Sequence, residues 1–313
     1  MLKKYTLKND FLEVTILNLG GIIHEIKMPD RNGLIENIIH GFKDIEDYKE
    51  NDAYFGAIIG RTAGRICKGK YDLNGEEFTM ETVDRGNGLH GGLNGFDKKY
   101  FIGHQEDNVL RLTYHSPHGE EGFPGNLDVE VIYTLEGDSL SIDYKGVSDR
   151  DTLLNMTNHS YFNLQPLKNI LDMELKLDSD YLIEIDKTSI PTGKLMDVSH
   201  TPFDFRKKKT IGRDLFSDHE QLIRGGGYDH PWLVKGALEL SASNGRKMVV
   251  TSDQACVVMY SYNFPILDHA KHLGLAIEFQ AEPDGIHHKG FNSSILKKGD
   301  TYTQKTVYKF IVD

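Results

Sequence analysis

The chain has 313 residues, of which 39% are hydrophobic and 27% are charged, a composition that suits a sizeable folded core and argues against disorder. Its formal net charge of −11 and its pI of about 5.7 disfavour nucleic acids and anionic membrane surfaces as partners. No apolar run approaches a signal peptide or the roughly 20 residues of a membrane helix, and the only cysteines, Cys67 and Cys256, argue against a disulfide framework. We therefore expect a cytoplasmic protein.

Alternation of apolar and polar residues predicts short β-strands along the whole chain. In chain order, the segments with this pattern are residues 11–28, 127–135, 139–147, 172–185, 247–264 and 301–312. The clearest signal is a β-hairpin, in which the run LDVEVIYTL turns at Glu136-Gly137-Asp138 and returns as SLSIDYKGV.

Helical periodicity is scarce, and only residues 44–51 and 213–224 predict short helices. Without alternating strand and helix units, a parallel sheet is not expected. We find no linker, no shift in composition and no repeat at a fixed period. The sequence therefore predicts one all-β domain spanning residues 1–313, a large antiparallel β-sandwich with few short helices.

Three common kinds of functional site are disfavoured. The glycines of GAIIGRTAGRI, residues 56–66, match neither phosphate-loop spacing, so we expect no nucleotide cofactor. The close histidine pairs at 115/118, 269/272 and 287/288 lack a metal-binding motif, so we expect no metal site. A serine-hydrolase elbow is missing, and neighbouring strand residues such as His159 and Ser160 face opposite ways.

Three polar residues are flanked in the sequence by glycines or apolar residues. Each has both a structural and a functional explanation. His90 in GLHGG belongs either to a tight turn or to a backbone that approaches a ligand closely. His159 in NMTNHSYFNL is either a hydrogen-bonded core histidine or the edge of a binding cleft. Asp229 in GGGYDHPW is either a turn cap or a ligand contact.

Glu278 is the most informative polar residue, because it lies inside the apolar run GLAIEFQ. Burying a carboxylate is costly unless it faces a partner or a polar cavity. A salt bridge to Arg61 or Arg65 is the structural explanation. The functional one, a carboxylate that lines a cleft, is slightly favoured.

Five segments together resemble the aldose 1-epimerase family. They are AGRICKGKY at 63–71, GLHGGLNGFDKKYF at 88–101, TNHSYFNL at 157–164, YDHPW at 228–232 and AIEFQAEPDG at 276–285. The resemblance implies a large antiparallel β-sandwich without a cofactor, which interconverts the α and β anomers of free hexoses such as galactose and glucose. It spans nearly the whole chain.

By matching position, the resemblance implies a role for each of five residues. Glu278 is expected to be the general base and His159 the general acid, while His90 helps to orient the sugar. Arg65 and Asp229 are expected to hydrogen-bond sugar hydroxyls. The resemblance leaves the oligomeric state open between monomer and homodimer.

Two departures from the family pattern and two rival functions stay open. Phe123 stands where many members have tyrosine, and Gly64 stands where some have asparagine; either residue could alter which sugar fits. A hexose 6-phosphate substrate would need cationic residues near C6, for which the motifs offer mainly Arg61 and Arg65. A catalytically silent sugar-binding module is the other rival, although binding alone needs no acid–base pair.

Overall fold

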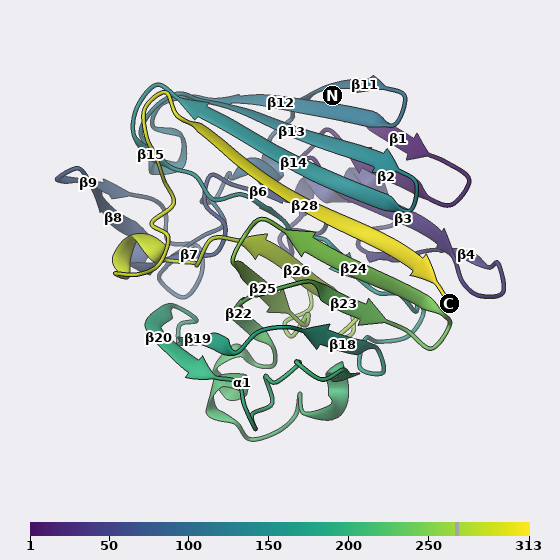
Figure 1. The fold of residues 1–313 in the computed structure, drawn as a ribbon. Coiled ribbons are helices and arrows are strands. Elements are labelled where there is room, and N and C mark those ends of the chain that lie inside the picture. The colour runs from purple at the N-terminus through teal and green to yellow at the C-terminus, as the bar shows by residue number, and fades with distance from the viewer. Residues whose placement is uncertain (267–268) are drawn as a thin grey trace.

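The computed structural model describes residues 1–266 and 269–313, which fold mainly into antiparallel strands (Figure 1). The largest sheet has nine strands. In order of pairing they are β11 (Ile102–Glu106), β12 (Val109–Ser116), β13 (Leu127–Glu136), β14 (Ser139–Ser148), β28 (Thr301–Val312), β24 (Arg246–Ser252), β23 (Leu238–Ser241), β18 (Glu174–Leu177) and β21 (Lys209–Thr210).

A second large sheet has seven strands. In order of pairing they are β20 (Pro191–Asp197), β19 (Tyr181–Ile185), β22 (Asp229–Leu233), β25 (Cys256–Tyr260), β26 (Leu275–Gln280), β17 (Tyr161–Phe162) and β5 (Ile39–His40). The two sheets meet across a core, where the ring of Phe162 lies 5.2 Å from that of Tyr308 on β28. The predicted antiparallel β-sandwich is confirmed.

Smaller sheets complete the strand set. The N-terminal sheet contains β1 (Lys4–Lys8), β2 (Glu13–Leu17), β3 (Ile23–Pro29) and β4 (Ile35–Asn37). Four two-stranded pairs are β7 (Arg65–Ile66) with β10 (Gly88–Leu89), β6 (Ile58–Ile59) with β16 (Thr157–Asn158), β15 (Thr152–Leu153) with β27 (Ile295–Leu296), and β8 (Lys70–Leu73) with β9 (Glu76–Thr79).

Helices are few and short in the described part of the chain. One α-helix, α1 (Glu220–Gly225), is accompanied by the 3₁₀ helices η1 (Ile45–Glu50), η2 (Cys67–Gly69), η3 (Phe96–Lys98), η4 (Glu120–Gly122), η5 (Ile211–Arg213) and η6 (Gly285–His287). No helix among these residues is long and apolar enough to cross a membrane.

The predicted elements compare closely with the observed ones. The hairpin forms as predicted, with Leu135 opposite Leu140 across the turn. The segment 44–51 forms the 3₁₀ helix η1, which begins where the Asp44 carboxylate accepts a hydrogen bond from the Glu46 N–H. The predicted helix 213–224 is wrong in its first half, because α1 begins only after His219, whose ring accepts a hydrogen bond from the Gln221 N–H.

Candidate active site

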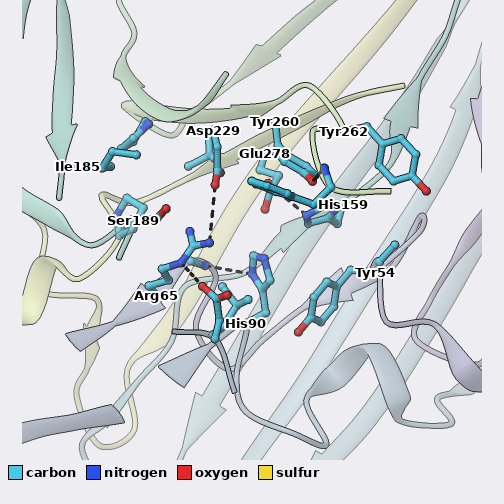
Figure 2. A pocket seen from close by; sticks show the side chains of 18 of the residues that line it. Tyr54, Arg65, His90, His159, Ile185, Ser189, Asp229, Tyr260, Tyr262 and Glu278 are labelled. Carbon is cyan, nitrogen blue, oxygen red and sulfur yellow. Dashed lines mark hydrogen bonds and ion pairs between the residues drawn. The ribbon is translucent and has the colours of Figure 1, made fainter. Parts of the chain in front are cut away.

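A cavity of about 270 Å³ lies against the seven-stranded sheet. Arg65 of β7 and His90, which follows β10, lie across the cavity from Asp229 and Glu278 (Figure 2). Side chains from β22, β25 and β26 form one wall, while residues of β7 and of the loops after β10 and β19 form others. Segments far apart in the sequence therefore meet around one space.

Strand register explains why His159 and Glu278 face each other. In the pairing of β17 with β26, Tyr161 lies opposite Ala276. Two residues further along the same antiparallel register, His159 comes opposite Glu278, and residues two apart on a strand share one face. A core strand and an irregular segment beside it thus direct an imidazole and a carboxylate to the same place.

The same register brings Asp229 to this face. Asp229 is the first residue of β22 and lies opposite Tyr260 of β25, which in turn lies opposite Ala276. Asp229 and Tyr260 accordingly line the cavity together with Tyr161, in a row adjacent to the row that contains Glu278. Trp232, on the other face of β22, packs into the core.

Glu278 and His159 form a buried pair at the bottom of the cavity. The distance between His159 Nε2 and Glu278 Oε1 is 3.5 Å, and the two residues are 4% and 2% exposed. Burial raises the pKa of Glu278 well above its usual range, with Asp229 adding to the shift and Arg65 opposing it. Burial also lowers the pKa of His159 to about 4. Both groups therefore favour their uncharged forms.

His90 completes this end of the cavity from the opposite wall. Its Nδ1 accepts a hydrogen bond of 3.2 Å from the Gly64 N–H, so the neutral ring carries its proton on Nε2. The ring lies edge-to-face against His159, with 5.3 Å between centroids, and against Tyr54 at 4.7 Å. Burial lowers the pKa of His90 well below its usual value, and His159 and Arg65 add to the shift. A neutral N–H donor therefore lies beside the buried pair.

Arg65 lies between two carboxylates on the wall of the cavity. Its Nε donates to Asp84 Oδ2 at 2.7 Å, and its terminal nitrogen lies 3.7 Å from Asp229 Oδ2. Burial opposes the charge of Arg65, but Asp229 and Asp84 outweigh it and raise the pKa of the guanidinium. Burial raises the pKa of Asp229, with Arg65 opposing. The long contact to Asp229 leaves both groups able to hydrogen-bond a ligand.

One group of side chains has the composition of a metal site. His90, His159 and Glu278 each offer a ligand atom, and these atoms lie within 4.8 Å of one another. Two imidazoles and a carboxylate form one of the ligand sets of catalytic zinc, but a ligating histidine normally donates its second N–H to a fixed acceptor. His159 Nδ1 has no hydrogen-bond partner in the described residues, which favours an acid–base role over metal binding.

All five residues singled out in the sequence, Glu278, His159, His90, Arg65 and Asp229, line this one cavity. Sequence reasoning missed Asp84, Tyr54 and Gln280, which also line it. Gln280 could have been found, because it lies two residues after Glu278 on β26 and so shares its face. Nothing in the sequence near Tyr54 and Asp84 indicates that they approach His90 and Arg65.

Arg61 does not lie in the cavity, contrary to both uses considered for it from sequence. It is 2% exposed and donates to uncharged groups, among them Ser116 Oγ and the carbonyl oxygens of Pro124 and Gly125. Glu278 pairs instead with His159. Phe123 also lies apart from the cavity, packed against Tyr71, whereas Gly64 lines it.

Comparison with known proteins identifies the family. A family model described as aldose 1-epimerase matches residues 3–309. The chain belongs to this family. Among the relatives of this aldose 1-epimerase family member, a galactose mutarotase from Bos taurus and one from Homo sapiens are each 36% identical over 99% of this chain and 94% of their own. An aldose 1-epimerase from Haemophilus influenzae is 35% identical over 97% of this chain and 94% of its own.

Solved structures of the family have the same fold. A C. elegans aldose epimerase homologue superposes with a TM-score of 0.94 at 25% identity, covering 100% of both chains. A galactose 1-epimerase from Lactobacillus acidophilus has a TM-score of 0.89 at 28% identity, covering 100% of this chain and 98% of its own. The likeness therefore extends over the whole chain of this family member.

Proposed function

We propose that this family member is a mutarotase that interconverts the α and β anomers of free hexoses such as galactose and glucose. The observation that carries the proposal is the buried pair of Glu278 and His159, 3.5 Å apart at the bottom of a cavity. Anomer exchange needs a base and an acid that act on two neighbouring oxygens, and an adjacent carboxylate and imidazole supply both.

In the proposed reaction, the Glu278 carboxylate takes the proton of the anomeric hydroxyl as protonated His159 donates a proton to the ring oxygen. The bond between C1 and the ring oxygen breaks, and C1 becomes the aldehyde of the open sugar. After rotation about the C1–C2 bond, the ring oxygen attacks the other face of C1. Glu278 returns its proton to the new hydroxyl and His159 recovers its own, so neither group ends the cycle changed.

The environment of the pair supports this exchange. The ionised combination, carboxylate with imidazolium, and the neutral combination, carboxylic acid with imidazole, contain the same number of protons. Burial favours the neutral combination, which is also the state that ring opening produces. The open sugar is thus formed together with the less costly state of the pair. His90, with its Nε2–H, and the Arg65–Asp229 pair offer further hydrogen bonds to sugar hydroxyls.

The charges that line the cavity favour a neutral sugar over a sugar phosphate. Arg65 and Arg85 are accompanied by the carboxylates of Asp52, Asp84 and Asp229, even without Glu278, and Arg65 is already paired. A dianionic phosphate would bring further negative charge to a site where carboxylates outnumber cations. Free hexoses avoid this cost.

The test is polarimetry of freshly dissolved α-galactose and α-glucose at several protein concentrations. The initial rate should exceed the spontaneous rate and rise in proportion to protein. Glu278→Gln and His159→Asn should each lower kcat by about 10²–10⁴-fold, because each removes one proton-transfer group. Glu239→Gln, at a residue that does not line the cavity, should retain the wild-type rate.

Sugar binding measured by calorimetry separates the rival functions. A wild-type protein that binds galactose or glucose without accelerating mutarotation would contradict the proposal and favour a silent binding module. Acceleration confined to galactose 6-phosphate or glucose 6-phosphate would favour the phosphate branch instead. Full activity in Glu278→Gln would reject the assigned base.

Two further expectations from the sequence stay proposals. The first is a cytoplasmic location. It is supported by the low number of cysteines, because the two that are present are unpaired thiols in the structure and unpaired thiols are typical of a reducing compartment. A free aldose is the proposed partner, and the acidic net charge of −11 disfavours nucleic acids. Size-exclusion chromatography with light scattering would decide between monomer and homodimer.

A further inference from the structure

The cavity has a buried end and an end open to solvent. Glu278 and His159 are 2% and 4% exposed, whereas Phe264, which lines the same cavity, is 51% exposed. The side chain of Arg85, another lining residue, is 33% exposed. Arg85 and Phe264 therefore stand at the outer end, away from the proposed acid–base pair.

Arg85 occupies a turn position that arginine rarely takes. In the turn from Asp84 to Asn87, Arg85 has a φ of +50° and Gly86 a φ of +81°, and the Asn87 N–H donates to the Asp84 carbonyl at 2.8 Å. A turn with positive φ at both central positions favours asparagine, aspartate or glycine at the first of the two. Arginine is therefore disfavoured at position 85. Strained residues of this kind cluster at functional sites.

The guanidinium of Arg85 connects three segments at the outer end. One terminal nitrogen donates to Ser189 Oγ at 2.8 Å, and the Cζ atom lies 5.5 Å from the centre of the Phe264 ring. Ser189 is 3% exposed and itself has a φ of +62°, so the group that receives the hydrogen bond is buried and held in an uncommon conformation.

The ring of Phe264 contacts a second segment besides Arg85. An added Cβ on Gly226 would lie 2.6 Å from the Phe264 Cζ, so the ring packs closely on the backbone of this glycine, just after α1. Arg85 thus links the turn at residues 84–87 to Ser189 and to a fixed aromatic ring. The three side chains form a bridge, which we call the Arg85 clasp.

We propose that the Arg85 clasp narrows the open end of the cavity and limits the length of the sugar that is accepted. This inference rests on the proposed function, because it places the anomeric carbon beside Glu278 and His159. A reducing disaccharide has the same free anomeric centre as a hexose, but its second ring must project away from that centre. With C1 beside the buried pair, the far side of the first ring, where O4 and O6 are attached, faces the open end, so a second ring joined there would meet Arg85 and Phe264.

The test compares mutarotation of glucose with that of maltose and melibiose, whose reducing unit is glucose and whose second ring is attached through O4 and O6. The wild-type protein should have a lower kcat/KM for both disaccharides than for glucose. Arg85→Gly removes the side chain and suits the positive φ, so folding is not put at risk. It should raise the disaccharide-to-glucose ratio of kcat/KM by about tenfold for at least one disaccharide, the low end of what one pocket contact contributes to discrimination.

Ser189→Ala removes only the hydrogen bond and should shift the ratio in the same direction by a smaller factor. Arg213→Gly is the matched control, at an exposed arginine that does not line the cavity, and should leave the ratio at its wild-type value. A ratio in Arg85→Gly within about twofold of wild type would overturn the clasp, as would a wild-type protein that turns over maltose as efficiently as glucose. If wild type accelerates neither glucose nor galactose, the proposed function fails and the clasp with it.

Discussion

At the scale of single residues, the opposed pKa shifts of Glu278 and His159 predict an unusual pH profile. The pair should carry one proton at pH values between the lowered pKa of His159, which is about 4, and the raised pKa of Glu278, because burial shifts the two pKa values apart. Below about pH 4 both groups are protonated, and the base is lost. As the pH rises through the raised pKa of Glu278, the pair loses its remaining proton, and the acid is lost.

We therefore expect kcat/KM for galactose to follow a bell-shaped curve whose acid limb lies near pH 4, well below the ordinary histidine value of about 6.5. Polarimetric rates corrected for spontaneous mutarotation at each pH would measure it. The limb near pH 4 should be missing from the residual activity of His159→Asn. An acid limb centred near pH 6.5 would show that His159 titrates like an exposed imidazole and would contradict the buried pair.

At the scale of elements, the sequence predicted strands well because the physical signal is local. In each strand of the hairpin β13–β14, side chains alternate between the core and the surface. The sequence shows this alternation over ten consecutive residues. The strand β26 has no such signal, since all six of its residues are buried. A polar residue in such a strand, Glu278, is instead an indication of a site.

The parts that sequence could not predict depend on contacts between distant segments. The role of Arg61 is one example, since its acceptors Ser116, Pro124 and Thr152 are separated from it by 55 to 91 residues. Whether an arginine in a glycine-rich motif binds a ligand or a set of loop carbonyls is decided only by the tertiary structure. The strain at Arg85 and its bridge to Ser189, 104 residues away, could not be predicted for the same reason.

Replacing Arg61 should strongly lower the free energy of unfolding without directly affecting the candidate active site. Arg61→Met fills a similar space but leaves the Ser116, Pro117, Pro124 and Gly125 acceptors without their donor. Since each buried unsatisfied group costs about 1–3 kcal/mol, the free energy of unfolding should fall by at least about 3 kcal/mol. Urea denaturation would measure the loss.

The control for this change is Arg111→Met, on the exposed face of β12, where the side chain pairs with Glu130. Its free energy of unfolding should change by no more than about 0.5 kcal/mol. Per folded molecule, Arg61→Met should retain its mutarotase rate, because Arg61 lies outside the cavity. Equal stability of the two variants would show that the hydrogen bonds of Arg61 contribute little.

At the scale of the whole molecule, the core argues for the single domain that the sequence predicted, and we propose it on that basis. One continuous cluster of buried apolar residues includes both Leu7 of β1 and Phe310 of β28. The C-terminal strand β28 pairs with β14 on one side and with β24 on the other, so it joins the two halves of the nine-stranded sheet (Figure 1). Neither half can complete this sheet alone.

Chains of this length often unfold through intermediates, so cooperative unfolding would be informative. We expect a single transition in urea, with coincident midpoints for far-UV circular dichroism and for the fluorescence of Trp232, the only tryptophan, which is fully buried on β22 of the other large sheet. Phe310→Ala, which truncates a buried ring on β28, should lower the free energy of unfolding by about 3–5 kcal/mol. Because the two sheets share one core, both probes should report the same loss. A Trp232 transition that keeps its wild-type midpoint while the circular dichroism shifts would divide the chain into separate folding units.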